Sequence, residues 1–168
     1  MICPVCGQLN LPGTEQCSNC LFDLMAIDRP IPTDRVEASL LRDPVSVLEP
    51  KPPVTVNLDA TLGEAIAKML SRSVGALLVL DAAGGLAGIL TECDFLTKVA
   101  GAADFASRPV RDYMTPRPET AALGDPLALA LAKMDGGSYR HLPITAGGQP
   151  VGVVSVRDML RHLVHLCG

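Results

Sequence analysis

The sequence predicts an α/β fold of two similar β-α-β-β-α units packed as a pair, preceded by a small cysteine-rich ribbon. Two internal repeats predict the pair: GILTECD at residues 88–94 returns as GVVSVRD at residues 152–158, and the block at 56–69 returns at 121–134. Two Cys-x-x-Cys pairs within the first 20 residues predict the ribbon. Repetition at a nearly fixed spacing indicates two copies of one structural unit.

The composition bounds the size and type of the core. The 168 residues suit one ordinary domain, or a small domain followed by a compact pair. The chain is apolar (48% hydrophobic, mean hydropathy +0.31) but has no Trp, two Tyr and three Phe, so we expect an aliphatic core. The apolar run at residues 74–90 is interrupted by Asp81 and the glycine turn at 82–85, and it is too short to span a bilayer.

Charge and the start of the sequence restrict the partners and the compartment. The net charge of −4 disfavours a surface for nucleic acid or anionic membranes, because such surfaces need clustered Lys and Arg. No charged and then apolar leader opens the sequence, so we expect a cytoplasmic protein with no membrane partner.

The first predicted unit, residues 1–24, is a zinc ribbon. Its two Cys-x-x-Cys pairs have the spacing of a tetrahedral site, because each pair turns two thiolates toward one metal; the four ligands are Cys3, Cys6, Cys17 and Cys20. A segment this small cannot build a core, so the metal supplies its folding free energy. Iron is the alternative metal. Disulfides would need an oxidising compartment, and a redox motif does not need a second pair.

The ribbon carries the wrong charge for nucleic acid. Before residue 30 it has one basic residue, Arg29, against three acidic ones, and a zinc ion held by four thiolates adds two negative charges. A surface that binds DNA or RNA backbone needs the opposite balance. We therefore expect the ribbon to contact an unknown protein partner or to be purely structural.

A connector, residues 25–53, follows the ribbon. Residues 27–32 (IDRPIP) are predicted to be extended, because proline restricts both itself and the residue before it. A short helix is expected over 35–42, since Val36, Leu40 and Leu41 share one face, and we expect that face to pack on the core of the pair.

The two repeated units are expected at residues 54–108 and 109–168. In the first, strand 54–56 leads to helix 61–72, strands 76–80 and 86–90 flank the glycine turn, and a helix runs from 91 to 99. Within that helix Cys93 is expected to be a small buried residue. In the last helix, His162 and His165 are interpreted as cations placed favourably at a helix C-terminus.

Each repeated motif places a hydroxyl and a carboxylate at the start of a helix. Unpaired backbone N–H groups and the helix dipole favour an anion there. The pairs Thr91/Asp94 and Ser155/Asp158 also fit capping boxes, in which the side chains satisfy only the helix's own donors. Two copies with a matching glycine, inside a longer repeat, favour a ligand role over capping alone.

Four markers together resemble the CBS domain. They are the V-x-L-D-x-x-L-x-E-A-I-x-x-M block, the R-H-L-P-I strand, the paired G-h-h-[TS]-x-x-D motifs and the Y-M-T-P between the units. The tandem, over about residues 44–167, resembles a CBS pair (a Bateman module). This resemblance implies adenosine-bearing ligands such as AMP, ADP, ATP or S-adenosylmethionine in clefts between the repeats, and a homodimer that buries apolar helix faces.

The resemblance also implies which residues hold the ligand. Carried over to this sequence, the resemblance implies that Asp94 and Asp158 bind ribose hydroxyls and that Thr91 and Ser155 lie beside the phosphate. It also implies that Arg140 and His141 contact phosphates and that Thr55 and Thr120 line the base or ribose side. In the first repeat, Gly75 and Ala76 stand where the second has Arg140 and His141, so we expect the two clefts to differ.

The sequence thus favours a regulatory, ligand-sensing module over an enzyme. No nucleophile–base pair, glycine-rich phosphate loop or open catalytic metal set is evident in it. Two alternatives stay open: a dimerisation or adaptor scaffold that senses nothing, and a transcriptional regulator whose ribbon reads DNA.

Overall fold

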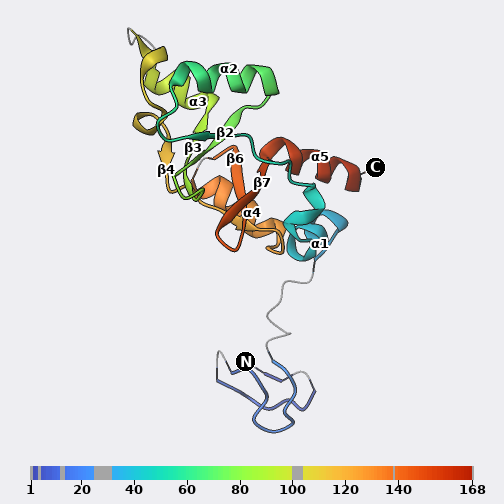
Figure 1. Cartoon of the computed structure of the whole chain (residues 1–168). Coiled ribbons are helices and arrows are strands. Elements are labelled where there is room, and N and C mark those ends of the chain that lie inside the picture. Colours follow the sequence, from blue (N-terminus) through green and yellow to red (C-terminus); the bar gives the residue numbers. More distant parts are fainter. Residues whose placement is uncertain are drawn as a thin grey trace. The chain divides into compact units, whose positions relative to one another are not determined.

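The structure is a computed structural model that describes residues 2–3, 5–11, 14–24, 32–99, 104–137 and 139–167. It divides into two compact units, residues 1–34 and 35–168, which we describe separately (Figure 1). Most of the extended segment predicted at 27–32 lies outside the described residues. The larger unit is the predicted mixed α/β fold with two sheets.

The first sheet has the strand order β1-β2-β3-β4, with β1 parallel to β2 and the other pairs antiparallel. Its elements are β1 (Thr55–Asn57), α2 (Leu62–Arg72), β2 (Ala76–Leu80), β3 (Leu86–Thr91) and β4 (Thr115–Pro116). Residues 76–79 of β2 are all buried, so this strand is the centre of the core. The predicted strands and helix are confirmed to within a residue or two.

The second sheet repeats the first in the order β5-β6-β7, again with a parallel and then an antiparallel pair. Its elements are β5 (Ala121–Ala122), α4 (Leu127–Gly136), β6 (His141–Ala146), β7 (Gln149–Ser155) and α5 (Val156–Cys167). Leu127, Ala130 and Met134 of α4 are buried, as their counterparts Leu62, Ala65 and Met69 of α2 are. The repeated sequence block therefore places equivalent side chains in two equivalent cores.

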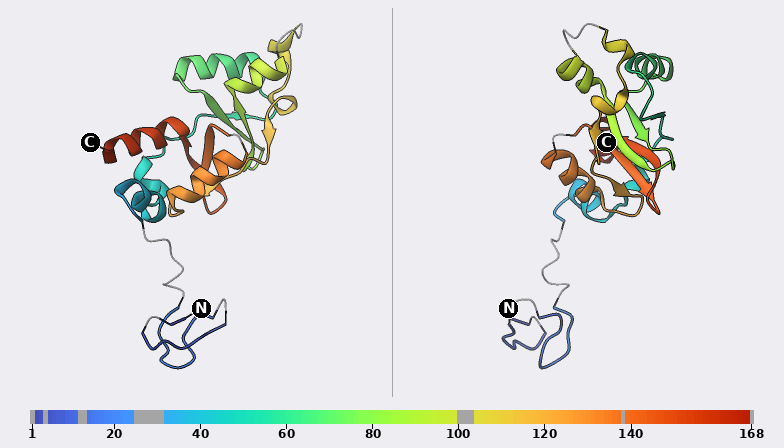
Figure 2. Two further views of the ribbon diagram at one scale, coloured as in Figure 1. Left: turned by 180° about the vertical axis from the view of Figure 1, so that it is seen from behind. Right: turned by 60° about the vertical axis from the view of Figure 1, so that its left-hand side comes forward.

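The segment before the first repeat completes the core of the second repeat, and the segment before the second repeat completes the core of the first. Helix α1 (Arg35–Arg42) has the predicted bounds and packs on α4 and α5, and Val45 of the 3₁₀ turn η1 (Val45–Leu48) is fully buried in the second core (Figure 2). In return, Val110 of η4 (Val110–Asp112) is fully buried in the first core, beside the short turn η3 (Phe105–Ser107). The predicted division at 108/109 stays a prediction, and the two cores interleave around it.

The glycine of each repeated motif lies where this exchange brings two strands together. Lys51 pairs with Val153 next to Gly152, and Pro116 pairs with Gly88. A Cβ at position 152 would lie 2.7 Å from the Pro50 Cβ, and one at position 88 would overlap the Met114 sulfur and lie 2.9 Å from a backbone carbonyl. Only glycine allows this close approach, which explains why the motif repeats it.

The helix predicted at 91–99 begins as α3 (Glu92–Asp94) and continues as the π-helical turn η2 (Phe95–Val99). A π turn within a helix is often found at a functional site. The prediction of a buried Cys93 is wrong, because this residue of α3 is exposed. None of the helices in the described ranges combines the length and apolar composition that crossing a bilayer requires.

Candidate functional site

In the first repeat, the hydroxyl and the carboxylate of the motif (Thr91 and Asp94) are hydrogen-bonded to each other. Oδ2 of Asp94 accepts hydrogen bonds from the Thr91 backbone N–H and hydroxyl, both at 2.7 Å. Its Oδ1 forms an ion pair with Lys98 at 2.6 Å, and Lys98 also donates to the Tyr113 carbonyl at 2.8 Å. Asp94 is only 6% exposed. Both carboxylate oxygens of Asp94 therefore have a partner within the protein.

The second pair repeats this geometry in a more open place. Oδ2 of Asp158 accepts from the Ser155 backbone N–H at 2.9 Å and from its hydroxyl at 2.6 Å, while Oδ1 contacts Arg161 at 3.1 Å. Arg161 is an exposed side chain, 56% accessible. Partial burial alone would raise the pKa of Asp158, but the hydrogen bonds from Ser155 outweigh it and the pKa is lowered. This carboxylate is ionised at neutral pH.

Both pairs are thus capping boxes in this arrangement. The capping interpretation accounts for Oδ2 in each repeat. It leaves Oδ1, which a ligand reaches by displacing Lys98 in the first repeat and Arg161 in the second, both of them exposed side chains.

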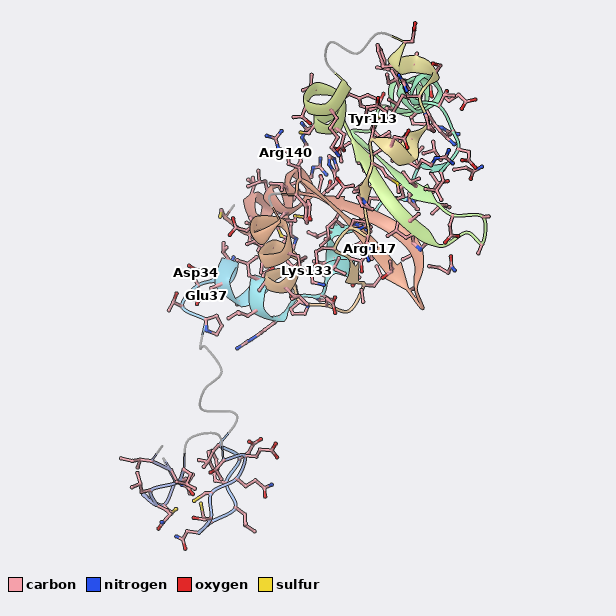
Figure 3. The ribbon with its side chains drawn as sticks, turned by 90° about the vertical axis from the view of Figure 1, so that its left-hand side faces the viewer. Asp34, Glu37, Tyr113, Arg117, Lys133 and Arg140 are labelled. Atoms are coloured by element: carbon pink, nitrogen blue, oxygen red, sulfur yellow. The ribbon has the colours of Figure 1, made fainter. Side chains whose placement is uncertain are left out.

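A cavity of about 1010 Å³ lies between the two repeats. Its wall comes from α2, the start of β2, α3 and η2 on one side, and from the starts of β6 and α5 on the other. Its polar lining is Glu92, Arg140, His141, Ser155 and Arg157, together with Ser73. Figure 3 shows Arg140 at the junction of the two repeats. The cavity has the size of a small-molecule site and a mostly apolar wall.

The two sides of this cavity have the same backbone and different charges. The N–H of Glu92 donates to the Gly75 carbonyl at 3.1 Å, as the N–H of Val156 donates to the Arg140 carbonyl at 3.0 Å. The second repeat therefore presents a guanidinium where the first has no side chain. Next to it, His141 pairs with Ser155 in the β6–β7 register. Burial lowers the pKa of His141, although the nearby charges of Glu92 and Asp158 oppose this.

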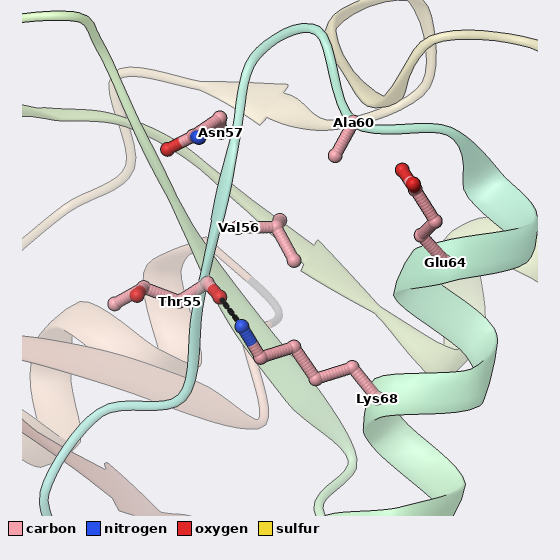
Figure 4. A pocket seen from close by; sticks show the side chains of 6 residues that line it. All are labelled: Thr55, Val56, Asn57, Ala60, Glu64 and Lys68. Carbon is pink, nitrogen blue, oxygen red and sulfur yellow. Dashed lines mark hydrogen bonds between the residues drawn. The ribbon is translucent and has the colours of Figure 1, made fainter.

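A smaller cavity of about 380 Å³ lies between β1 and α2, where Thr55 is one of the lining residues (Figure 4). Lys68 reaches across it and donates to the Thr55 carbonyl at 2.7 Å. In the second repeat Lys133 donates to the Thr120 carbonyl at 2.6 Å. The two lysines match in the repeated block, so their common role was detectable in the sequence.

The structure brings together some of the predicted residues and separates others. Ser155, Arg140 and His141 line the larger cavity, and Asp158 adjoins it through Ser155. Thr55 lines the smaller one. Thr91, Asp94 and Thr120 are in the lining of neither cavity. Sequence reasoning missed Glu92 and Arg157, because they occupy motif positions at which the two copies differ and no pattern marks them.

The four ribbon cysteines converge as predicted for a metal. Their Sγ atoms all lie within 4.8 Å of one another, with Cys3–Cys20 at 3.6 Å and Cys6–Cys17 at 3.5 Å. Zn–S bonds of about 2.3 Å in a tetrahedron place sulfurs about 3.8 Å apart, so the donor set fits zinc. A disulfide would need sulfurs at about 2 Å.

The two knuckles of the ribbon are copies of one turn. The Cys3 N–H donates to the Gln8 carbonyl and the Cys17 N–H donates to the Phe22 carbonyl, both at 2.9 Å. The residue before each acceptor has a positive φ, 72° at Gly7 and 59° at Leu21.

Hydrogen bonds from the backbone, first from Cys20, lower the pKa of the Cys17 thiol to about 6. At Cys20 a backbone hydrogen bond from Phe22 is outweighed by burial and by the neighbouring thiols, which raise the pKa to about 12. The thiols of the ribbon thus share their protons unequally when no metal is bound.

A partly buried cluster joins α1 to α5. The Ser39 hydroxyl donates to Asp43 at 2.5 Å and lies 2.8 Å from Nε2 of His162. Of the two histidines interpreted as cations at the helix C-terminus, His165 lies in the last turn of α5, whereas His162 lies before that turn and contacts α1. The cluster is not a catalytic triad, since the imidazole does not lie between the hydroxyl and the carboxylate.

Comparison with known proteins identifies the larger unit. The family model for the CBS domain matches residues 45–101 and 110–165. A CBS domain-containing protein of Arabidopsis thaliana is 38% identical over 109 residues, which are 64% of this chain and 20% of that protein. A 17.7 kDa protein of Acidianus ambivalens is 36% identical over 110 residues, 65% of this chain and 66% of its own length. The chain therefore spans only about a fifth of the Arabidopsis relative.

Solved structures agree on the fold. A CBS-domain protein of Agrobacterium tumefaciens has a TM-score of 0.65 and 29% identity, covering 70% of this chain and 94% of that one. A CBS domain protein of Pyrobaculum aerophilum, solved in complex with AMP, has a TM-score of 0.64 and 27% identity, covering 73% and 98%. These matches confirm the predicted CBS pair.

Proposed function

The chain belongs to the CBS domain family, and from this we propose that residues 35–168 are a regulatory module that binds an adenosine-containing ligand beside Ser155 and Asp158. The observation that carries the proposal is that Ser155, Arg140 and His141 line one cavity. The Pyrobaculum relative binds AMP, which supports the ligand class.

The ligand's groups are assigned by chemistry. Asp158 accepts hydrogen bonds from the ribose hydroxyls through Oδ1, after Arg161 moves into solvent. The phosphate lies at the N-terminal turn of α5, where Ser155, Arg140 and His141 provide donors and positive charge. The charge of Lys51 also lowers the pKa of Asp158. Thr55, which lines the smaller cavity in this structure, is proposed to contribute the base or ribose side.

We propose that the first cleft is the weaker one. Asp94 is held by its ion pair with Lys98 and by the Thr91 hydroxyl, and the basic pair is replaced by Gly75 and Ala76. Thr120 would line the base side there. A ligand in this cleft would have to displace Lys98 from Asp94 and would gain no phosphate contact from a basic strand start in return.

The experiment is a calorimetric titration of zinc-loaded protein with AMP, ADP, ATP and S-adenosylmethionine, using wild type, Asp158→Ala and Asp94→Ala. Both variants lose the same cap, so they are matched controls for folding. We expect saturable binding that Asp158→Ala abolishes and Asp94→Ala retains. Binding lost only in Asp94→Ala would assign the other cleft. No binding by any ligand, with an intact fold, would leave the non-sensing scaffold as the better account.

We propose that Cys3, Cys6, Cys17 and Cys20 hold zinc, rather than iron, in a structural site in the reducing cytoplasm. The test is metal content after expression with both metals supplied, together with Cys6→Ser. One zinc per chain, lost in the variant, supports the site. Iron, with its visible absorption, would contradict the assignment.

We further propose that the ribbon contacts a protein partner. Its described part exposes several large apolar side chains: Ile2, Val5, Leu9, Leu11, Leu21 and Phe22. An apolar surface of this density on so small a unit is typical of an interaction site. The DNA-reading alternative predicts salt-dependent binding to DNA, and the acidic ribbon opposes it.

The pair is proposed to form a homodimer. Leu70 of α2, Leu96 of η2, and Leu160 and Val164 of α5 are between 56% and 75% exposed. Sedimentation equilibrium tests this, with Leu160→Glu and Val164→Glu as disrupting variants. A monomer at micromolar concentration would contradict the proposal.

A further inference from the structure

Resting on the proposed function, we propose that Glu92 restricts the cavity to adenosine ligands of low negative charge, so that AMP binds in preference to ATP. Glu92 comes from the first repeat but lines the same cavity as Arg140, His141 and Ser155 of the second. It therefore brings a carboxylate of the first repeat to the cavity in which the second repeat presents its basic strand start.

The carboxylate occupies the place of a missing side chain. A Cβ at Gly75 would lie 3.2–3.3 Å from the carboxyl atoms of Glu92. Gly75 is the counterpart of Arg140, at the start of the equivalent strand. Where the second repeat presents a guanidinium, the first therefore presents a negative charge, and the two charges share one cavity.

These charges are not used by the protein. Within the described part of the chain, no ion pair or side-chain hydrogen bond engages Glu92, Arg140 or Arg157. Three charged groups around one cavity, two positive and one negative, are thus available to a ligand. The charge of Glu92 also acts on His141, which shows that the two walls are within electrostatic range.

The preference for AMP over ATP follows from the order of ribose and phosphates along a nucleotide. With ribose at Asp158, the first phosphate meets Ser155, Arg140 and His141, and each further phosphate adds negative charge to the cavity that Glu92 also lines. Like charges in a partly desolvated cavity repel each other. ATP carries about two more negative charges than AMP, whereas the ammonium group of S-adenosylmethionine would be tolerated.

The test is calorimetric titration with AMP, ATP and S-adenosylmethionine at fixed salt and without Mg²⁺, which would neutralise the triphosphate. The proteins are wild type, Glu92→Gln and Glu92→Lys, with Asp104→Asn as the control because Asp104 is an exposed acid of the first repeat outside the cavity lining. Glu92 is itself exposed, so its replacement does not disturb the core.

We expect wild type to bind AMP roughly tenfold or more tightly than ATP. Glu92→Gln should reduce this preference roughly tenfold with AMP affinity changed less than about threefold, Glu92→Lys should reverse it, and Asp104→Asn should leave it unchanged. AMP binding with an unaltered AMP-to-ATP ratio in both Glu92 variants would overturn this inference while leaving the proposed function standing. Absence of binding by every ligand would overturn both.

Discussion

The two repeats have the same backbone and opposite electrostatics at the place where they meet. In each repeat, a hydroxyl and a carboxylate cap the second helix. A lysine of the first helix donates to a backbone carbonyl at or next to the first strand, and the glycine of the repeated motif lies against a neighbouring segment with no room for a Cβ. Yet the first repeat presents Gly75 and Glu92 to the shared cavity, while the second presents Arg140 and His141.

The comparison separates what the fold needs from what a ligand needs. The features that both repeats share are explained by capping, crossing and core packing. The features in which they differ include two charged side chains, Glu92 and Arg140, which line the cavity and form no ion pair within the described residues. The unshared residues are therefore better indicators of function in this chain than the shared ones.

The largest expected effect comes from the shared glycines. Gly88→Ala should lower the free energy of unfolding by about 2–3 kcal/mol, because its Cβ meets a backbone carbonyl at 2.9 Å. Gly152→Ala should cost about 1–2 kcal/mol, since its Cβ meets the ring of Pro50 in the segment between η1 and β1. Urea denaturation measures both, with Gly124→Ala as the control because nothing lies within 4 Å of that position. Equal stability of all three variants would show that the crossing is not tight.

Removing the unshared guanidinium should affect binding and not folding. Arg140→Gln is expected to weaken AMP binding roughly tenfold to thirtyfold, because a charge-assisted contact to phosphate is lost. Arg111→Gln, which removes an exposed arginine paired with Asp59 outside the cavity lining, is the control. Calorimetry measures the affinities. An unchanged affinity in Arg140→Gln would place the phosphate elsewhere.

The two matched lysines, Lys68 and Lys133, should each make a smaller contribution to stability than the glycines. Lys133→Met should lower the free energy of unfolding by about 1 kcal/mol, because its bond to the Thr120 carbonyl is partly buried and Glu119 lies 3.7 Å away. Lys68→Met, whose bond is exposed, should cost about half as much. Thermal denaturation of the matched pair checks the order, and a larger loss at Lys68 would contradict it.

The smallest expected effect is a pH dependence of binding. Burial lowers the pKa of His141, against the charges of Glu92 and Asp158 and with those of Arg140 and Arg157. The imidazole is then neutral at pH 8 in the free protein, and a bound phosphate favours its protonated form. AMP affinity should therefore rise about threefold as pH falls from 8 to 6.5.

His141→Gln separates this effect from protonation of the phosphate itself, whose second pKa is about 6. Titrations at both pH values should show the rise in wild type and not in the variant. The same pH dependence in both proteins would exclude His141 as the titrating group.

Much of the architecture was predictable because repetition and periodicity are local signals. The bounds of α1 and β2, the burial of the α2 and α4 faces, and the convergence of four cysteines follow from spacing alone. The capping pairs were also predictable, since hydroxyl and carboxylate are three residues apart. The contact of His162 with α1 was not predictable, because its partners, Ser39 and Asp43, are more than a hundred residues away in the chain.

By itself, then, the sequence determined two copies of one unit, a four-thiol ribbon and the residues that cap the helices, because these depend on neighbours within a few turns of chain. Only the tertiary structure decided that Glu92 lines the same cavity as the basic start of β6. It also decided that the segment before the first repeat packs in the second core and that the segment before the second repeat packs in the first core. The physical reason is that charge–charge encounters and strand crossings depend on how the two sheets meet. That meeting is set by packing between distant segments, which no local pattern records.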